Sequence, residues 1–194
     1  MNRTFSAVVL AAGRSTRMGT EKALLDADGR AWWERQCEVL REAGAGEVFL
    51  SVRSDQRWAE DPAVISRFDA VVRDAVPECG PLGGIAAALA QATYPQVAVL
   101  AIDLPGMPAT WFRALLEKAQ SGVGVVGRRD HCFEPLAALY PREMSGLVHA
   151  ALAAGDYSLQ RLLRAAVADG FMRVTEISPQ QALWFENRNE PRGR

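Results

Sequence analysis

The sequence predicts an α/β fold: a three-layer α/β/α sandwich, with a mainly parallel sheet, formed by one domain over residues 1–194. Two observations support this prediction. Strand-like apolar runs alternate with helix-like segments along the chain, which is the order that builds parallel sheets. Residues 8–10 and 97–102 are apolar in succession, so helices should cover both faces of these strands.

The N-terminal part begins with a strand over residues 6–12. Apolar side chains then recur at near-helical spacing from Trp32 to Leu40, and Gly44 stops this pattern, so a helix should lie there. Two further strands are expected at 48–52 and 69–73, with a weakly helical segment around Trp58 and Val64 between them.

The middle of the chain contains a loop over residues 74–84 that is too rich in Gly and Pro for regular structure, followed by an alanine-rich helix over 85–92. The most apolar strand, 97–102, comes next and has Asp103 at its carboxyl end. A helix over 109–120 follows, beginning after Pro108.

The C-terminal part continues the alternation, without a repeat or a linker. The segments after residue 120 again alternate strand-like apolar runs with helical patterns. The expected elements are strands at 122–126, 135–140, 171–175 and 183–185, and helices at 143–153 and 158–168.

Composition limits the classes of partner. Lys and Arg number 22 and Asp and Glu 23, so the net charge is −1, and we expect a small-molecule substrate, not a nucleic acid or a membrane. Cys37, Cys79 and Cys132 lack C-x-x-C spacing and favour reduced thiols over a disulfide framework or a zinc site. The sequence shows neither a signal pattern nor an apolar run near the roughly 18 residues of a membrane span, so we expect a cytoplasmic protein.

The loop after the first strand has the chemistry of a triphosphate site. Small residues at its start let backbone N–H groups approach an anion, Arg17 can grip phosphate oxygens bidentately, and Lys22 adds a compact charge. The spacing matches neither the Walker motif nor the dinucleotide motif. By itself this stretch is equally compatible with a purely structural role, as a strand followed by a polar loop and an amphipathic helix.

Three loops, 11–22, 74–84 and 103–107, follow strand ends and should line one crevice. Set against a triphosphate, Asp103 would serve best by holding Mg²⁺. The alternatives are structural: Asp103 as a helix-capping carboxylate, and Asp74 as the cap of a turn.

Several of these motifs together resemble the molybdenum cofactor nucleotidyltransferases, most closely the guanylyltransferases. They are the stretch from Leu10 to Gly19 with Lys22, Gly80-Pro81-Leu82-Gly83-Gly84, Ile102-Asp103-Leu104-Pro105, Glu134-Pro135-Leu136, and residues 185–191. The resemblance implies a Rossmann-like nucleotidyltransferase fold and Mg²⁺-dependent transfer of GMP from GTP to molybdopterin, with release of pyrophosphate. It also implies transient contact with cofactor insertion machinery or acceptor enzymes.

The resemblance also implies roles for individual residues. Lys22, Arg17 and Asp103 are the expected catalytic residues, with Asp103 as the metal ligand, and Asn187 and Asn189 should lie on the pterin side. The expected nucleotide contacts are Leu10, Ala11, Ala12, Gly13, Lys22, Ser51, Asp74, Gly80, Pro81 and Leu82.

Two features of the sequence bear on the choice of base. Leu-Ala-Ala-Gly at 10–13 is typical of the related cytidylyltransferase. Gly80-Pro81-Leu82, by contrast, resembles the corresponding loop of the guanine-specific enzymes. We expect GTP ahead of CTP, with the methyl group of Ala12 pointing away from the base and the 80–84 loop opening for the larger ring. Another acceptor, such as a sugar phosphate, and a non-catalytic nucleotide-binding assembly protein remain alternatives; Lys22 and Asp103 argue against the latter.

Overall fold

The computed structural model describes residues 4–13, 26–27, 30–73 and 78–186. Its strands are β1 (Phe5–Leu10), β2 (Asp26–Ala27), β3 (Arg30–Ala31), β4 (Ala45–Val52), β5 (Ala70–Arg73), β6 (Gln96–Ala101), β7 (Gly124–Arg129), β8 (Cys132–Pro141) and β9 (Met172–Glu176). Its α-helices are α1 (Trp32–Ala43), α2 (Pro62–Ile65), α3 (Pro81–Gln91), α4 (Ala109–Lys118), α5 (Ser145–Ala153), α6 (Leu159–Ala168) and α7 (Pro179–Ala182). Short 3₁₀ helices are η2 (Arg57–Glu60), η3 (Arg142–Met144) and η4 (Leu183–Phe185). No helix in the described part of the chain is both long and apolar enough to span a membrane.

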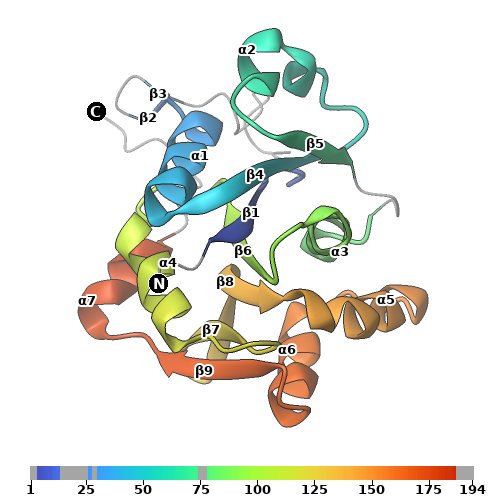
Figure 1. Ribbon diagram of the computed structural model, residues 1–194, viewed down its shortest axis with the longest axis vertical. Helices are drawn as coiled ribbons and strands as arrows, with labels where there is room; N and C mark the ends of the chain where they lie inside the picture. Colours follow the sequence, from blue (N-terminus) through green and yellow to red (C-terminus); the bar gives the residue numbers. More distant parts are fainter. Residues whose placement is uncertain (1–3, 14–25, 28–29, 74–77, 187–194) are drawn as a thin grey trace.

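One sheet of seven strands, in the order β5-β4-β1-β6-β8-β7-β9, runs through the molecule (Figure 1). All neighbouring pairs are parallel except those of β8, which is antiparallel to both β6 and β7. The mainly parallel sheet predicted from the sequence is therefore confirmed, and β8 is the reversed strand within it. β2 and β3 form a separate pair.

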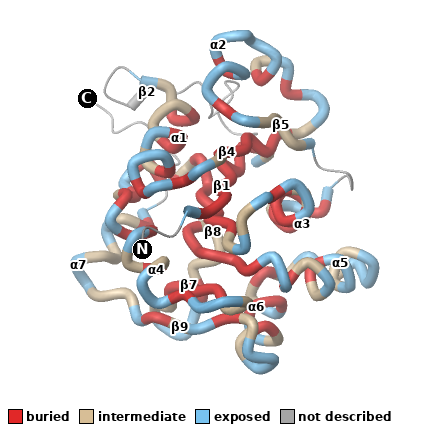
Figure 2. Tube along the Cα trace, in the orientation of Figure 1, coloured by how far each residue is buried: buried red, intermediate tan, exposed pale blue. Residues whose placement is uncertain are grey.

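Helices cover both faces of the sheet, with α1 and α4 on one side and α3, α5 and α6 on the other (Figure 1). Successive residues of β1 enter different cores: Val9 packs with α1 and α4, whereas Val8 and Leu10 pack with α3. All of β1 is buried, as the sheet strands at the centre of Figure 2 are. The unbroken apolar runs thus reflect cover on both faces, and the predicted three-layer sandwich is confirmed.

The start of α3 differs from the prediction. We expected a loop through residue 84, but the helix begins at Pro81, four residues before Ile85. Proline suits the first helical position because its fixed φ is helical and its missing N–H is not needed there. Gly80 precedes it at φ 62°, a left-handed conformation that favours glycine. The Gly-rich stretch is therefore mostly a helix N-terminus, not a loop that opens.

The predicted strand at 183–185 is wrong, because these residues form η4. Ser178 and Gln181 make a capping box that starts α7, and η4 continues directly from it. The ring of Phe185 then packs edge-on against Trp111 of α4, with ring centroids 5.2 Å apart. Local capping and this aromatic contact outweigh the short apolar pattern.

Most other elements agree with the prediction. The bounds of β7 and β8 differ from the predicted strands at 122–126 and 135–140. β7 begins at Gly124, because Gly122 lies in a turn at φ 71°. β7 and β8 form a hairpin whose two tip residues, Asp130 and His131, have φ of 47° and 68°. Positive φ at both central positions matches the right-handed twist of the flanking strands.

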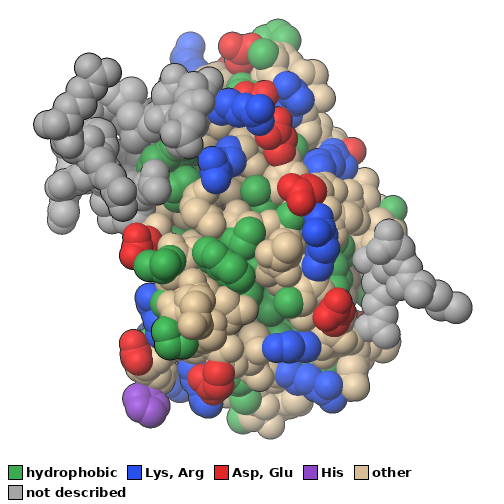
Figure 3. Space-filling model, turned by 90° about the vertical axis from the view of Figure 1, so that its left-hand side faces the viewer, with side chains coloured by type: hydrophobic (Ala, Val, Ile, Leu, Met, Phe, Trp, Pro, Cys, Tyr) green, Lys and Arg blue, Asp and Glu red, His purple; other side chains and the backbone are tan. Residues whose placement is uncertain are grey.

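Charged side chains of both signs are interspersed on the side of the molecule that carries α1, α4 and α7 (Figure 3). Several of them form exposed ion pairs, such as Arg113 with Glu42 at 2.9 Å and Arg67 with Glu34 at 2.8 Å. Pairs of this kind contribute little to stability in water. Apolar packing in the two cores, one on each face of the sheet, stabilises the fold.

Candidate functional site

The carboxyl ends of three adjacent strands meet at one edge of the sheet. The register places Leu10 of β1 beside Ser51 of β4 on one side and Ala101 of β6 on the other. The pairing continues past the strand: Ala11 N–H donates to Ser51 O at 2.8 Å, and Ile102 N–H donates to Leu10 O at 3.0 Å. The segments carrying Ala11 and Ile102 therefore leave the sheet side by side, as the parallel order predicts.

The backbone that follows β1 is held by side chains from the turn after β4. Arg53 donates from one guanidinium nitrogen to Ala12 O at 2.8 Å and to Gly13 O at 3.0 Å. The amide of Gln56, which is 2 % exposed, donates to Ala11 O at 3.0 Å and accepts from Arg53 N at 2.8 Å. These bonds fix the small-residue segment where an anion would approach the main chain.

The N-terminus of α3 packs onto the same strand ends. A Cβ added to Gly84 would lie 2.4 Å from Ser51 Oγ and 2.7 Å from Leu10 Cδ2, so only glycine allows this close approach. The first N–H groups of a helix lack intrahelical partners and attract anions. Because Gly84 lies in the first turns of α3, its contacts bring Leu10 and Ser51 next to the helix start at Pro81 and Leu82.

Asp103 lies in the turn that follows β6. The turn is closed by Leu104 N–H donating to Ala101 O at 3.3 Å and by Met107 N–H donating to Leu104 O at 3.1 Å. The structure argues against the capping alternative, because the N-cap of α4 is Pro108. Asp103 is partly exposed at the carboxyl edge, where a ligand would bind.

Asp103 is a single carboxylate in the turn after β6. Among the described residues, no cluster of three or more His, Cys, Asp or Glu side chains could enclose a metal. Mg²⁺ commonly binds through one or two carboxylates together with substrate phosphates and waters. The single carboxylate of Asp103 is compatible with that mode.

Five predicted site residues, Arg17, Lys22, Asp74, Asn187 and Asn189, lie outside the described residues. The described chain leads to each of them from the candidate site or its neighbourhood. Gly13 follows β1, and Arg73 ends β5.

The C-terminal segment approaches the Asp103 turn. A Cβ on Gly106 would lie 3.5 Å from Leu183 O and 3.7 Å from Trp184 Cα. Glu186, the last described residue, is two positions beyond Trp184. The chain before Asn187 is thus close to the turn that carries Asp103.

Glu134 of β8 lies at this carboxyl edge, beyond the last β6 partner of the strand, Ala137 opposite Leu100. Its carboxylate pairs with Arg129 at 3.0 Å, and its side chain is only 22 % exposed. Burial raises the pKa of Glu134, and the Arg129 charge opposes this rise. The site edge thus holds a second carboxylate, in a poorly solvated position.

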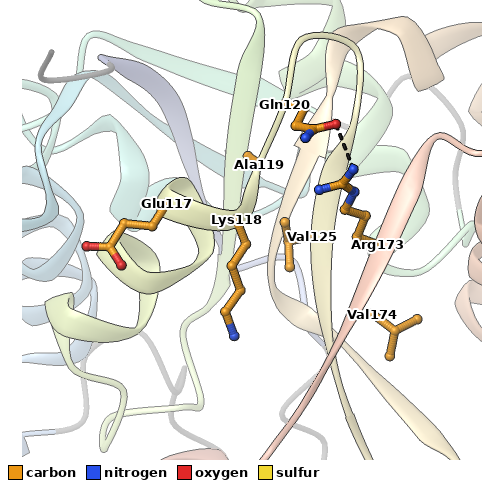
Figure 4. Close-up of a pocket in the computed structure, with 7 residues that line it drawn as sticks. All are labelled: Glu117, Lys118, Ala119, Gln120, Val125, Arg173 and Val174. Atoms are coloured by element: carbon orange, nitrogen blue, oxygen red, sulfur yellow. Dashed lines mark hydrogen bonds between the residues drawn. The ribbon is translucent and has the colours of Figure 1, made fainter.

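A cavity of about 390 Å³ lies at the opposite, amino edge of the sheet (Figure 4). Arg173 donates to Gln120 Oε1 at 2.7 Å, and Gln96, at the start of β6, donates to Gln120 O at 3.0 Å. Glu117 points away from the other labelled side chains (Figure 4). This cavity shares no residue with the predicted site. Its lining residues are Glu117, Lys118, Ala119, Gln120, Val125, Arg173 and Val174.

Sequence reasoning missed Arg53, Gln56 and Gln36, whose side chains hold the two turns. Arg53 and Gln56 follow a predicted strand, so their place after β4 at the site edge was a usable signal. Gln36 lies within a helical pattern, where a polar residue one turn from each of the apolar Trp32 and Leu40 is the one usable signal.

Comparison with known proteins identifies the family. Residues 7–170 match the model of the MobA-like NTP transferase domain. A probable molybdenum cofactor guanylyltransferase from Opitutus terrae is 39 % identical over 189 residues, which cover 96 % of this chain and 91 % of that protein.

Solved structures share the fold. Molybdopterin-guanine dinucleotide biosynthesis protein A from Archaeoglobus fulgidus superposes with a TM-score of 0.73 at 22 % identity, covering 96 % of this chain and 93 % of that one. A Mycobacterium tuberculosis H37Rv protein in complex with manganese has a TM-score of 0.62 at 20 % identity, covering 90 % of this chain and 86 % of that one. By its sequence match and its fold, this chain belongs to the MobA-like NTP transferase family of nucleotidyltransferases.

Proposed function

We propose that this protein transfers GMP from GTP to the terminal phosphate of molybdopterin and releases pyrophosphate. The observation that carries the proposal is the meeting of the β1, β4 and β6 ends, which sets a fixed backbone turn beside the turn of Asp103. The relative named as a guanylyltransferase, which matches nearly the whole chain, supports the same activity. The substrates are then GTP and molybdopterin.

The nucleotide is held by backbone and by small side chains at the β1 end of the edge. Its phosphates lie against the segment after β1 and against the N-terminus of α3, where the first N–H groups of the helix favour negative charge. The nucleotide contacts we propose are Leu10, Ala11, Ala12, Gly13, Ser51, Asp74, Gly80, Pro81 and Leu82. Arg17 grips the outer phosphates, and Lys22 follows the charge that grows on the departing pyrophosphate.

Asp103 holds Mg²⁺ against the nucleotide phosphates. When bound, the ion supplies charge stabilisation to the transferred phosphoryl group. The manganese complex of the M. tuberculosis protein, which shares the fold, is compatible with a divalent metal. We place Asn187 and Asn189 on the pterin side, since the chain before them packs near the Asp103 turn.

The preference for GTP rests on the relatives named as guanylyltransferases and on the Gly80-Pro81-Leu82 sequence at the start of α3. Guanine presents one acceptor and two donor groups on its edge, whereas cytosine presents two acceptors and one amine. A pocket shaped by fixed backbone groups leaves unpaired polar atoms with the wrong base, at about 1–3 kcal/mol for each. Leu-Ala-Ala-Gly at 10–13 is the feature that favours CTP, so the two bases must be compared directly.

The test supplies each of the four nucleoside triphosphates with Mg²⁺ and molybdopterin, and measures pyrophosphate release and the dinucleotide formed. We expect release with GTP that requires molybdopterin and yields molybdopterin guanine dinucleotide. Faster turnover with CTP would assign the chain to cytidylyl transfer. Nucleotide binding without release for any triphosphate would support the non-catalytic alternative, and a sugar phosphate tested in place of molybdopterin would reveal a different acceptor.

A further inference from the structure

We infer that Gln36 is a positioning residue for the metal-binding carboxylate: its buried amide fixes the turn that carries Asp103. The inference rests on the proposed metal role of Asp103. Helix α1, which carries Gln36, would then affect metal affinity in addition to packing against the sheet.

Gln36 lies on α1 and is fully buried. Its side-chain amide nitrogen donates to Leu104 O at 2.8 Å and to Ala101 O at 3.3 Å. These two carbonyls flank Ile102 and Asp103, so one amide group spans the segment that carries the carboxylate.

The same carbonyls close the two consecutive backbone turns described above, since Ala101 O accepts from Leu104 N–H and Leu104 O from Met107 N–H. Gln36 therefore joins both turns and anchors them to α1. On the other side, Ile102 N–H donates to Leu10 O and ties the segment to β1. The backbone around Asp103 is thus fixed from the sheet and from the helix layer.

Packing alone does not explain an amide at this position. Within the described part of the chain, Gln36 Oε1 is buried and accepts no hydrogen bond, which costs free energy that an apolar side chain would not incur. Neighbouring residues on the same buried face, such as Cys37 and Leu40, are apolar. The two donated bonds are what the glutamine adds.

A fixed turn matters for a metal site, because residues that orient a ligand commonly change metal affinity by about 10–100-fold when replaced. Gln36→Met keeps the length of the side chain and removes the donors. Gln36→Asn keeps an amide but is one methylene group too short to reach both carbonyls, and it provides a second variant if the first does not fold.

Two variants serve as controls. Leu40→Ala opens the same buried face of α1 one turn further on, so it lowers the melting temperature while both hydrogen bonds of Gln36 stay in place. Gln56→Met removes a second buried amide, which holds Ala11 O instead, so it should weaken binding of the GTP analogue and leave Mn²⁺ affinity unchanged once the analogue is saturating.

The experiment measures Mn²⁺ binding by electron paramagnetic resonance with a non-hydrolysable GTP analogue present, and the melting temperature of each variant. We expect Gln36→Met to weaken Mn²⁺ binding by about tenfold or more, and Leu40→Ala to bind Mn²⁺ as the wild type does. Wild-type Mn²⁺ affinity in folded Gln36→Met or Gln36→Asn protein would overturn the inference.

Asp103→Asn separates this inference from the proposed function. If Asp103→Asn weakens Mn²⁺ binding and Gln36→Met does not, the proposed metal site stands and the role of Gln36 is wrong. If Asp103→Asn binds Mn²⁺ like the wild type, the metal assignment itself is wrong, and the role of Gln36 falls with it.

Discussion

The carboxyl and amino edges of the sheet use their polar side chains in different ways. At the carboxyl edge, Arg53 and Gln56 donate to backbone carbonyls and thereby shape the turn after β1. Around the cavity of about 390 Å³ at the amino edge, Arg173 and Lys118 instead bond to side chains, those of Gln120 and Thr175. This cavity is thus not where the family motifs meet. We place the candidate site by the strand ends and the helix N-terminus, and not by the cavity.

The largest expected effect is on kcat, and it should distinguish a carboxylate at the carboxyl edge from one at the amino edge. Asp103→Asn should lower kcat by about 100-fold or more, because a neutral amide is a poor ligand for Mg²⁺ and the ion supplies several kcal/mol of charge stabilisation. Glu117→Gln, at the amino edge, is the matched change and should leave turnover as it is. Steady-state kinetics at saturating Mg²⁺ measure both, and equal turnover in the two variants would remove the distinction between the edges.

A pair of glycines tests close packing at the two edges. Gly84→Ala should destabilise the protein by about 1–3 kcal/mol, since the added Cβ meets Ser51 and Leu10. Gly146, in α5 after the amino-edge end of β8, has open space around its Cβ position, so Gly146→Ala should stabilise by about 0.5–1 kcal/mol. Denaturant unfolding compares the two. A stabilised Gly84→Ala protein would contradict the tight contact of α3 with the strand ends.

Arginines at the two edges should differ in their effect on KM. Arg53→Ala removes two bonds to the segment after β1, so KM for GTP should rise by about tenfold, with a smaller change in kcat. Arg173→Ala removes only the bond to Gln120 and should leave KM for GTP unchanged. Initial rates over a range of GTP concentrations give both values. A larger rise for Arg173→Ala would move the nucleotide to the amino edge.

The smallest expected effect concerns the desolvated carboxylate of the carboxyl edge. Burial raises the folded-state pKa of Glu134 above its ordinary value. Between the ordinary pKa of a glutamate and the raised pKa of Glu134, the folded protein binds more protons than the unfolded chain. The free energy of unfolding therefore falls as pH rises through this interval. Glu134→Gln should remove this slope from the melting temperature measured between pH 4 and pH 7, taken as roughly the carboxylate range. Parallel curves for the two proteins would show that Glu134 is well solvated.

The sequence was sufficient for the layers and for the strand ends. Unbroken apolar runs predicted strands buried on both faces, and β1 and β6 are such strands. The same pattern placed Asp103 at a strand end, which the structure confirms. These features depend on local periodicity, which a single sequence displays directly.

Other features depended on contacts that local patterns do not show. The start of α3 at Pro81 was mistaken for loop because glycine disfavours helix interiors, yet Gly84 packs so closely on Ser51 that a larger residue would clash. Likewise Gln36 bonds to carbonyls that are more than 60 residues away in the chain. The catalytic roles of Arg17 and Lys22 remain predictions from the sequence.

Hydrogen–deuterium exchange with and without a Mg²⁺-bound, non-hydrolysable GTP analogue most directly tests whether the carboxyl edge holds the nucleotide. We predict slower exchange in peptides covering Ala12–Gly13 and Leu82–Gly83, where we propose that N–H groups contact the phosphates, and no change in peptides covering Lys118–Gln120 and Arg173–Val174. Slower exchange confined to the second pair of peptides would place the nucleotide in the amino-edge cavity and contradict the account.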